Sequence, residues 1–312
     1  MLSRRTALAF GAMAALALAP RPAAALSVSL TSVADTGISE NYPNNNMGGN
    51  PFVNSGTTQN RTRNRGLFRF DVAAALPAGA KVQSATLVLE VVHEPDEQQP
   101  FSRFNLHRLL QPWGEGNKTS PTNCNSCVGQ GAPAGTNETT WFHRFAYTAS
   151  EWSAPGAAPT NDYAAQPSSG TTVYGVADSP YPFASTPQTV ADVQFWLDEP
   201  QSNFGWALVC QAEQTPFTAR RFGSRESPDR FPRLEIEFLV QPRIDRAEKV
   251  GGQFNLSFMA LAGQSYVVEY CDSLSGGVWQ TLAHVGMPAE TTRVLVIDPV
   301  LAPQRFYRVA SY

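Results

Sequence analysis

Short stretches in which apolar and polar residues alternate recur along most of the chain. They are rich in Val, Ile, Leu, Phe and Tyr, and they are separated by Pro, Gly and Asn, which are typical of turns. Because a strand buried on one face has this period of two, the pattern predicts an all-β protein built of antiparallel sandwiches. The clearest stretches are 66–72, 83–93, 104–110, 204–212, 233–239, 254–260, 266–270, 292–297 and 305–310.

Two regions depart from this alternation. Val190, Val193 and Trp196 follow a spacing of three, which predicts one amphipathic helix over 189–198. Residues 118–187 are rich in Gly, Pro, Ser, Thr and Asn, and this composition predicts long loops. We therefore expect little helix, and loops gathered in one segment.

The length of the chain favours two domains. Residues 240–250 lie between two clusters of predicted strands, and we place a domain boundary at residue 241. A large jelly-roll-like sandwich is expected over 26–240 and a smaller sandwich over 241–312.

The first 25 residues have the order of an export signal. Arg4 and Arg5 precede an apolar stretch over 6–19, which is followed by the small residues 23–25. The apolar stretch is too short to span a bilayer. Ser3 and the two arginines also resemble a twin-arginine signal, and ordinary secretion is an equal alternative. We expect a mature protein that is secreted, extracellular or on the surface of a bacterium.

The charge balance excludes some partners. The formal net charge is −3, and removing the leader takes away Arg4, Arg5 and Arg21 but no acidic residue. A mildly acidic protein does not attract nucleic acid. No later apolar run reaches the length of a transmembrane helix, so we expect a soluble monomer without a membrane span.

Two of the four cysteines are close in sequence. Cys124 and Cys127 lie in a segment rich in Gly, Pro and Asn, and in an exported protein we expect them to form a disulfide. A zinc site would need two further ligands at suitable spacing, and a thioredoxin-like pair would begin a helix. Cys210 and Cys271 lie in apolar stretches and are expected to be buried thiols.

A series of motifs in the first 240 residues resembles one known family. The longest, 65–89, reads as two strands joined by the turn 76–79. The series resembles the DNRLRE family, and this resemblance implies a jelly-roll-like sandwich of a kind that serves some relatives as a carbohydrate-binding module. The other motifs, in order, are 34–38, 113–117, 139–141, 190–197, 203–208, 221–226 and 232–236.

The last 70 or so residues resemble the small immunoglobulin- or fibronectin-like modules of exported bacterial proteins. The stretches that carry this resemblance are 254–260, 263–270, 279–282 and 305–309. It implies a small sandwich, for which we expect a core containing Tyr266, Val268, Tyr270, Trp279 and Phe306.

The sequence contains no nucleophile elbow, zinc-protease helix, phosphate loop or dinucleotide fingerprint. We therefore expect a non-catalytic protein that requires no cofactor. A polysaccharide lyase or hydrolase, with a site assembled from scattered residues, is the enzymatic alternative.

Two acidic residues indicate a structural calcium site. Asp35 lies near the first strand of the large domain and Glu226 near the last, and such strands often lie side by side in a jelly roll. Their oxygens, with backbone carbonyls, would suit calcium. The alternative is that Glu226 pairs with an arginine such as Arg69, Arg225 or Arg233.

Sugar recognition commonly uses an exposed aromatic ring together with amide, carboxylate and guanidinium groups. In the early polar loop, Arg61 and Arg63 are candidates for contacts with uronic acid carboxylates, although a solvated loop is the alternative. The aromatic candidates, all in the loop-rich segment, are Trp152, Tyr163, Tyr174 and Tyr181. The tryptophans expected in the core instead are Trp113, Trp141, Trp196 and Trp206.

These observations lead to a first hypothesis of an extracellular protein whose large domain binds a polysaccharide. The second hypothesis is a structural or adhesive protein whose partner is another protein or a component of the cell envelope.

Overall fold

The computed structural model describes residues 25–95, 99–124, 127–299 and 303–311. The predicted export leader, 1–25, lies outside the described residues except for Ala25. The chain divides into two compact units, Ala25–Val240 and Gln241–Tyr312.

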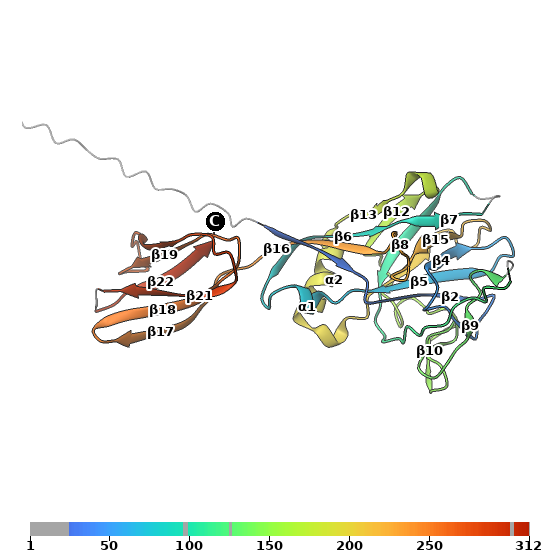
Figure 1. The fold of residues 1–312 in the computed structure, drawn as a ribbon, viewed down its shortest axis with the longest axis horizontal. Helices are drawn as coiled ribbons and strands as arrows, with labels where there is room; N and C mark the ends of the chain where they lie inside the picture. Colours follow the sequence, from blue (N-terminus) through green and yellow to red (C-terminus); the bar gives the residue numbers. More distant parts are fainter. Residues whose placement is uncertain (1–24, 96–98, 125–126, 300–302, 312) are drawn as a thin grey trace, which may run out of the picture. The chain divides into compact units, whose positions relative to one another are not determined.

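The large unit contains two main antiparallel sheets (Figure 1). The sheet that begins with the first strand has the order β1 (Leu26–Thr31), β16 (Arg233–Leu239), β6 (Lys81–Leu89), β13 (Tyr181–Phe183). The larger sheet has the order β12 (Ser169–Val173), β8 (Ser102–Arg108), β14 (Trp206–Cys210), β5 (Arg63–Arg69), β4 (Phe52–Thr57), β15 (Arg220–Gly223), β7 (Val91–His93), and β2 (Ala34–Ser39) also pairs with β5.

The first and last strands of this unit, β1 and β16, pair along their whole length, from Leu26 opposite Phe238 to Thr31 opposite Arg233. All the strand pairs in both sheets are antiparallel. The structure thus confirms the predicted all-β class and the antiparallel sandwich.

The main core lies between the two sheets. Leu87 and Ile236 from the smaller sheet and Phe68, Leu106 and Leu208 from the larger one belong to a single buried cluster. Each of these residues belongs to the apolar set of alternate positions in its strand, and alternate residues of a strand point to the same face. Burial of this continuous apolar cluster is the main force that stabilises the unit.

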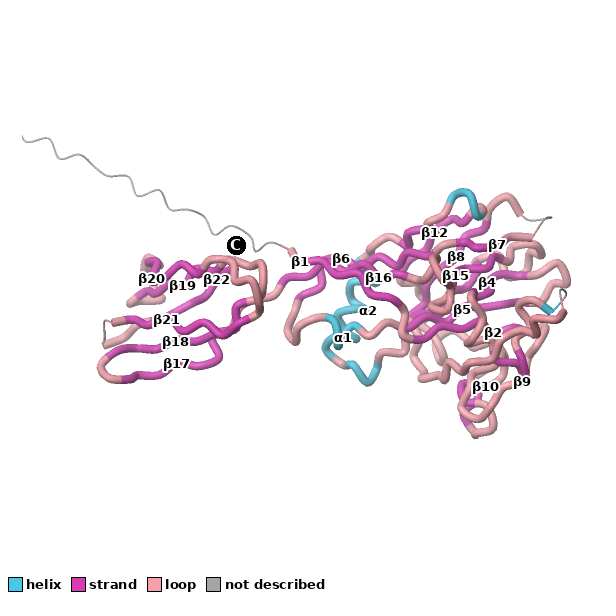
Figure 2. The backbone as a smooth tube through the Cα atoms, viewed as in Figure 1, coloured by secondary structure: helices cyan, strands magenta, loops and turns pink. Residues whose placement is uncertain are grey.

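A second core lies on the other face of the larger sheet. Leu67 and Ala207, the strand neighbours of two residues in the main core, point into it. The long segment that follows β8 covers this face, mostly as loop (Figure 2). Its short strands are β9 (Ala132–Pro133), which pairs with β3 (Asn45–Asn46), and the hairpin of β10 (His143–Phe145) and β11 (Ser150–Glu151).

The predicted helix is present as α2 (Pro187–Asp198). Thr186 caps its N-terminus, since its hydroxyl accepts hydrogen bonds from the amides of Gln188 and Thr189. Asp192 lies on the buried face, where Oδ2 accepts from Trp206 Nε1 at 2.9 Å. Other short helical turns whose residues are all described are α1 (Val72–Ala75) and the 3₁₀ turns Val176–Asp178 and Pro200–Ser202.

The small unit is a second antiparallel sandwich with three strands in each sheet. Its core contains Leu256, Phe258, Tyr266 and Val268, whereas Tyr270, Trp279 and Phe306 are only partly buried, which corrects the expectation for these three. The sheets are β17 (Ile244–Val250), β18 (Gln253–Ala260), β21 (Thr292–Asp298) and β20 (Gln280–Val285), β19 (Tyr266–Cys271), β22 (Phe306–Ser311).

Among the described residues, no helix has both the length and the apolar character needed to cross a bilayer.

Candidate functional site

A polar groove of about 730 Å³ crosses the large unit at the β4–β15 pair. Asn54 and Arg221, which lie opposite each other in this pair, contribute to its lining. Backbone amides in the two strands fix the spacing of these side chains. The remaining lining residues are Ser39, Asn41, Tyr42, Thr58, Gln59, Asn60, Asn64, His93, Pro95, Val128, Gly129, Gln130, Phe217, Ala219 and Arg220.

The groove differs in charge from the chain as a whole. Acidic residues outnumber basic ones in the chain, yet the described residues that line the groove include two arginines and no Asp or Glu. Burial lowers the pKa of both Arg220 and Arg221 from the ordinary arginine value. Both guanidinium groups nevertheless remain charged near neutral pH, so the groove favours anions.

Arg220 has a structural role beneath the groove. Its buried guanidinium donates hydrogen bonds to the carbonyls of Tyr174 at 2.8 Å, Gln99 at 2.7 Å and Ala219 at 3.0 Å. These bonds join segments on both sides of β15 and use most of its donors. Arg220 therefore contributes charge to the groove but holds it in shape rather than contacting a ligand.

Arg221 is the arginine in the better position for a ligand. Its guanidinium carbon lies 4.7 Å from the ring centroid of Phe52, and Nη2 donates to the carbonyl of Val128 at 3.2 Å. These contacts leave further guanidinium donors on a half-buried side chain.

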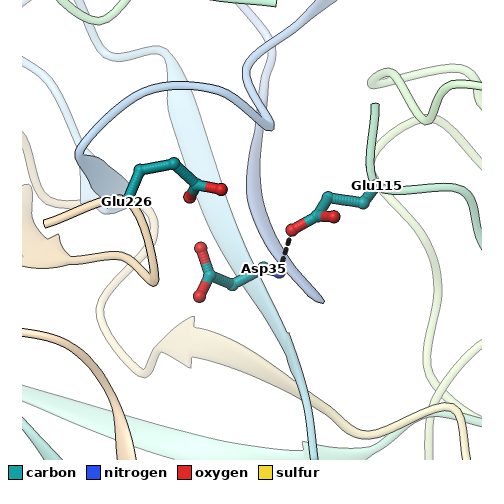
Figure 3. Close-up of side chains that lie close together, drawn as sticks. All are labelled: Asp35, Glu115 and Glu226. Atoms are coloured by element: carbon teal, nitrogen blue, oxygen red, sulfur yellow. Dashed lines mark hydrogen bonds between the residues drawn. The ribbon is translucent and has the colours of Figure 1, made fainter. Parts of the chain in front are cut away.

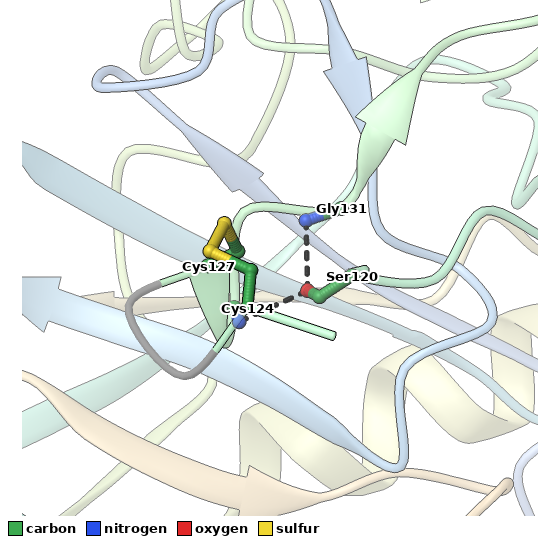
Figure 4. The surroundings of a disulfide bond; sticks show 5 residues. Ser120, Cys124, Cys127 and Gly131 are labelled. Atoms are coloured by element: carbon green, nitrogen blue, oxygen red, sulfur yellow. Dashed lines mark hydrogen bonds between the residues drawn. A yellow bond between two sulfur atoms is a disulfide. The ribbon is translucent and has the colours of Figure 1, made fainter. Parts of the chain in front are cut away.

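The predicted disulfide between Cys124 and Cys127 is present, with the Cα atoms 5.2 Å apart (Figure 4). The disulfide closes the turn immediately before Val128 and Gly129, which form part of one wall of the groove. Ser120 Oγ accepts hydrogen bonds from the amides of Gly129 and Gly131, both at 3.0 Å. Disulfide and hydroxyl thus fix the loop where it borders the groove.

An exposed pair of aromatic rings is connected to the groove through Arg220. Tyr174 is 48% exposed and Phe101 58% exposed, and their ring centroids are 5.9 Å apart. The Tyr174 carbonyl is one of the acceptors of Arg220. Tyr174 is therefore the predicted aromatic candidate whose ring is available to a sugar.

The other three predicted aromatic candidates are buried, and the expectation that they form an exposed platform is corrected. Trp152 and Tyr163 are 4% and 6% exposed and belong to the second core. Trp152 Nε1 donates to the Thr140 carbonyl at 3.0 Å. Tyr181 belongs to the main core, where its hydroxyl donates to the Gly175 carbonyl at 2.6 Å.

The two predicted arginines have different surroundings. Arg61 is exposed in the turn between β4 and β5, next in sequence to the groove residue Asn60. Arg63 instead pairs with Glu40 at 2.8 Å, and its hydrogen bond to that carboxylate raises its pKa. Arg63 therefore serves the fold, and Arg61 lies at the margin of the groove.

A separate cluster brings together three acidic residues: Asp35, Glu115 and Glu226 (Figure 3). One carboxylate oxygen from each lies within 4.8 Å of those of the other two. The structure therefore places the predicted pair, Asp35 and Glu226, close together. Glu115 is a third member that no pattern in the sequence singled out, although it lies in the motif 113–117.

Asp35 is the most deeply buried member of the cluster. Its Oδ2 accepts hydrogen bonds from Ser32 Oγ at 2.6 Å and from the amide of Arg225 at 2.9 Å. Its Oδ1 is buried and has no hydrogen-bond partner. Burial, reinforced by the charges of Glu226 and Glu115, raises the pKa of Asp35 to about 7.

Two glycines and an asparagine position Glu115. Asn46 is fully buried, and its Nδ2 donates to the carbonyls of Glu115 at 2.6 Å and Thr139 at 3.1 Å. At Gly114 a Cβ would lie 1.8 Å from the Asn137 carbonyl oxygen, and at Gly116, where φ is +78°, it would lie 2.3 Å from Asn46 Oδ1. Only glycine permits this close approach, so the loop presents Glu115 to the cluster.

A turn after β15 positions Glu226. Ser224 Oγ donates to the Asn50 carbonyl at 2.7 Å and accepts from the amide of Glu226 at 3.1 Å. Burial raises the pKa of Glu226, whose Oε2 is buried without a hydrogen-bond partner. Arg225 Nε lies 2.7 Å from Glu115 Oε1 and 3.0 Å from Glu226 Oε1. The predicted alternative, a pairing of Glu226 with Arg225, is thus also present.

No protein-family model matches the chain, and no curated protein matches its sequence. The resemblance to the DNRLRE family therefore stays a prediction from the order of the motifs.

Proposed function

We propose that the protein is an extracellular, non-catalytic carbohydrate-binding protein and that its large unit binds an acidic polysaccharide in the groove beside β15. The observation that carries this proposal is the composition of the groove, where hydroxyl, amide and guanidinium groups converge without an acidic residue among the described ones.

Each part of the groove has a role suited to sugars. Asn54, Gln59 and Asn60 offer both donors and acceptors, as a ring of hydroxyl groups requires. Tyr42 and Phe217 add aromatic surface for the apolar face of a sugar ring. The motif order resembles the DNRLRE family, some of whose members serve as carbohydrate-binding modules, and this resemblance supports the proposed role.

The charge of the groove selects among sugars. Arg221 supplies a guanidinium group with free donors, and such a fork matches the geometry of a carboxylate. A uronic acid chain would therefore bind more tightly than a neutral chain of similar shape. Because part of this preference is electrostatic, it weakens as the ionic strength rises.

Calorimetric titration with a polyuronate and with a neutral glucan tests the proposal. We expect the polyuronate to bind more tightly, and Tyr42→Ala or Arg221→Gln to raise its Kd roughly tenfold, about 1.4 kcal/mol. Tyr147→Ala is the matched control, since Tyr147 is 76% exposed and does not line the groove.

Three results would contradict the proposal. The first is failure of every polysaccharide to bind, and the second is equal binding by the control and the groove variants. The third is release of unsaturated oligosaccharides during the titration, which would assign a lyase activity to the groove instead.

A structural or adhesive role is the second candidate, and one feature of the small unit favours it. The outward face of the β18–β21 pair exposes three large apolar residues, Met259, Leu295 and Ile297. Such side chains are common where a surface meets another protein. Crosslinking on cells would favour this role if protein partners, rather than glycans, were captured.

A further inference from the structure

The acidic cluster lacks the groups that would balance its charge. Asp35, Glu115 and Glu226 carry three carboxylates, and among the described residues the side-chain cation paired with the cluster is Arg225, which contacts the two glutamates. Arg225 reaches Oε1 of both glutamates, while Asp35 Oδ1 and Glu226 Oε2 are buried with no hydrogen-bond partner. Buried carboxylate oxygens without a partner are costly and rare in folded proteins.

The carboxylates that carry these unpartnered oxygens lie close together. Figure 3 shows the carboxylates of Asp35 and Glu226 directed toward each other, with Glu115 beside them. Asp35 is only 1% exposed, so water does not solvate its Oδ1 from outside. We propose that Asp35, Glu115 and Glu226 bind a calcium ion.

The chemistry of the cluster selects the type of ion. All three side chains offer oxygen and none offers sulfur or imidazole nitrogen, so a hard cation is favoured over zinc or copper. Opposed oxygen ligands of calcium lie up to about 5 Å apart, and calcium tolerates irregular geometry. The ligand oxygens here lie within 4.8 Å of one another, a spread within the range that the ligands of one calcium ion span. Magnesium requires shorter bonds and a regular octahedron.

The ion would connect segments that are far apart in the chain. Asp35 lies in β2, Glu115 in the loop held by Asn46, and Glu226 in the turn after β15. The strand β15 also carries Arg220 and Arg221 in the groove. The ion therefore fixes the end of the strand on which the groove is built.

Calorimetry and thermal melting of the full chain test this proposal. After treatment with a chelator, calcium chloride should bind with a stoichiometry of one and raise Tm by roughly 5–10 °C at a hundredfold excess over Kd. Asp35→Asn, Glu115→Gln and Glu226→Gln should each lose this response. Asp229→Asn should retain it, because Asp229 is exposed in the same turn and outside the cluster.

The variant Asp35→Asn also tests folding separately from binding. Because it removes a buried charge, the chelated variant should melt at or above the Tm of the chelated natural chain. The proposal is overturned if calcium neither binds nor raises Tm, which would mean that Arg225 alone balances the cluster. It is also overturned if magnesium binds in preference, or if the three cluster variants bind calcium as well as Asp229→Asn does.

Discussion

Asp35 and Asp192 are both 1% exposed in the large unit, but their carboxylates have different surroundings. Around Asp192, Oδ2 accepts from Trp206 Nε1 and Ser168 Oγ, and Oδ1 lies 3.2 Å from Arg108 Nε. Around Asp35, one oxygen accepts two hydrogen bonds and the other has none. Two equally buried carboxylates thus differ in their partners. Protein groups bind both oxygens of Asp192, whereas Asp35 keeps one oxygen to which an ion can bind.

The largest expected effect on stability is that of replacing Asp192. Asp192→Ala removes the carboxylate that accepts from Trp206 Nε1 and pairs with Arg108. The buried indole N–H of Trp206 and the half-buried guanidinium of Arg108 then lose this partner. We expect the free energy of unfolding to fall by about 3–5 kcal/mol, as measured by denaturant titration.

The control for this variant is Asp198→Ala, which changes an exposed residue of the same helix. It should change stability by no more than about 0.5 kcal/mol. If Asp192→Ala lowers the free energy of unfolding by less than about 1 kcal/mol, Trp206 and Arg108 find other hydrogen-bond partners when the carboxylate is absent.

The next effect concerns Asp35 and depends on calcium. With calcium at saturation, Asp35→Asn should lower the free energy of unfolding by about 3 kcal/mol, because the stabilisation by the bound ion is lost. In chelator the same substitution should be neutral or stabilising, since it removes a buried charge. Denaturant titrations under the two conditions measure both values, and an equal loss in each would make Asp35 another structural aspartate like Asp192.

The smallest expected effect is at Arg225. Its side chain is 41% exposed, so its ion pairs with Glu115 and Glu226 are screened by solvent. In chelator, Arg225→Gln should cost about 1 kcal/mol. Calcium should remove most of this difference, since the ion supplies positive charge to the same carboxylates. Thermal melts of both chains with and without calcium measure it, and a difference that persists in calcium would count against a shared site.

Most of the fold follows from local patterns in the sequence. The strands around Leu87, Leu208 and Ile236 alternate clearly, because one face of each is buried in the main core. The helix at 189–198 is visible for the same reason, since its apolar residues lie on one side. Asp35 and Glu226 were paired correctly because they lie near the first and last strands, which the sandwich brings together.

The surroundings of the loops did not follow from the sequence. Trp152 and Tyr163 lie among Gly, Pro and Ser residues, which is typical of exposed loops, yet tertiary packing on the outer face of the sheet buries both rings. No periodicity signals this burial, since the segment contributes single side chains rather than a regular face. Glu115 was missed because its position depends on contacts with Asn46, which is about 70 residues away in the chain.

The groove was missed for a related reason. Its lining residues come from seven or more separate places in the sequence, and most are ordinary polar residues that carry no motif. Arg221 lay in a noted motif, but its neighbours across the groove are defined by strand pairing alone. The polar character of these residues indicates a binding groove only once the order of the strands shows that they lie together.

The three carboxylates of the acidic cluster span almost the whole large unit. Asp35 and Glu115 are separated by 80 positions, and Asp35 and Arg225 by 190. A fragment that stops before Glu226 retains at most two of the ligands, as does one that starts after Asp35. Calcium affinity would therefore report whether a purified sample is still intact across this region, since proteolytic trimming past Asp35 or Glu226 would remove a ligand.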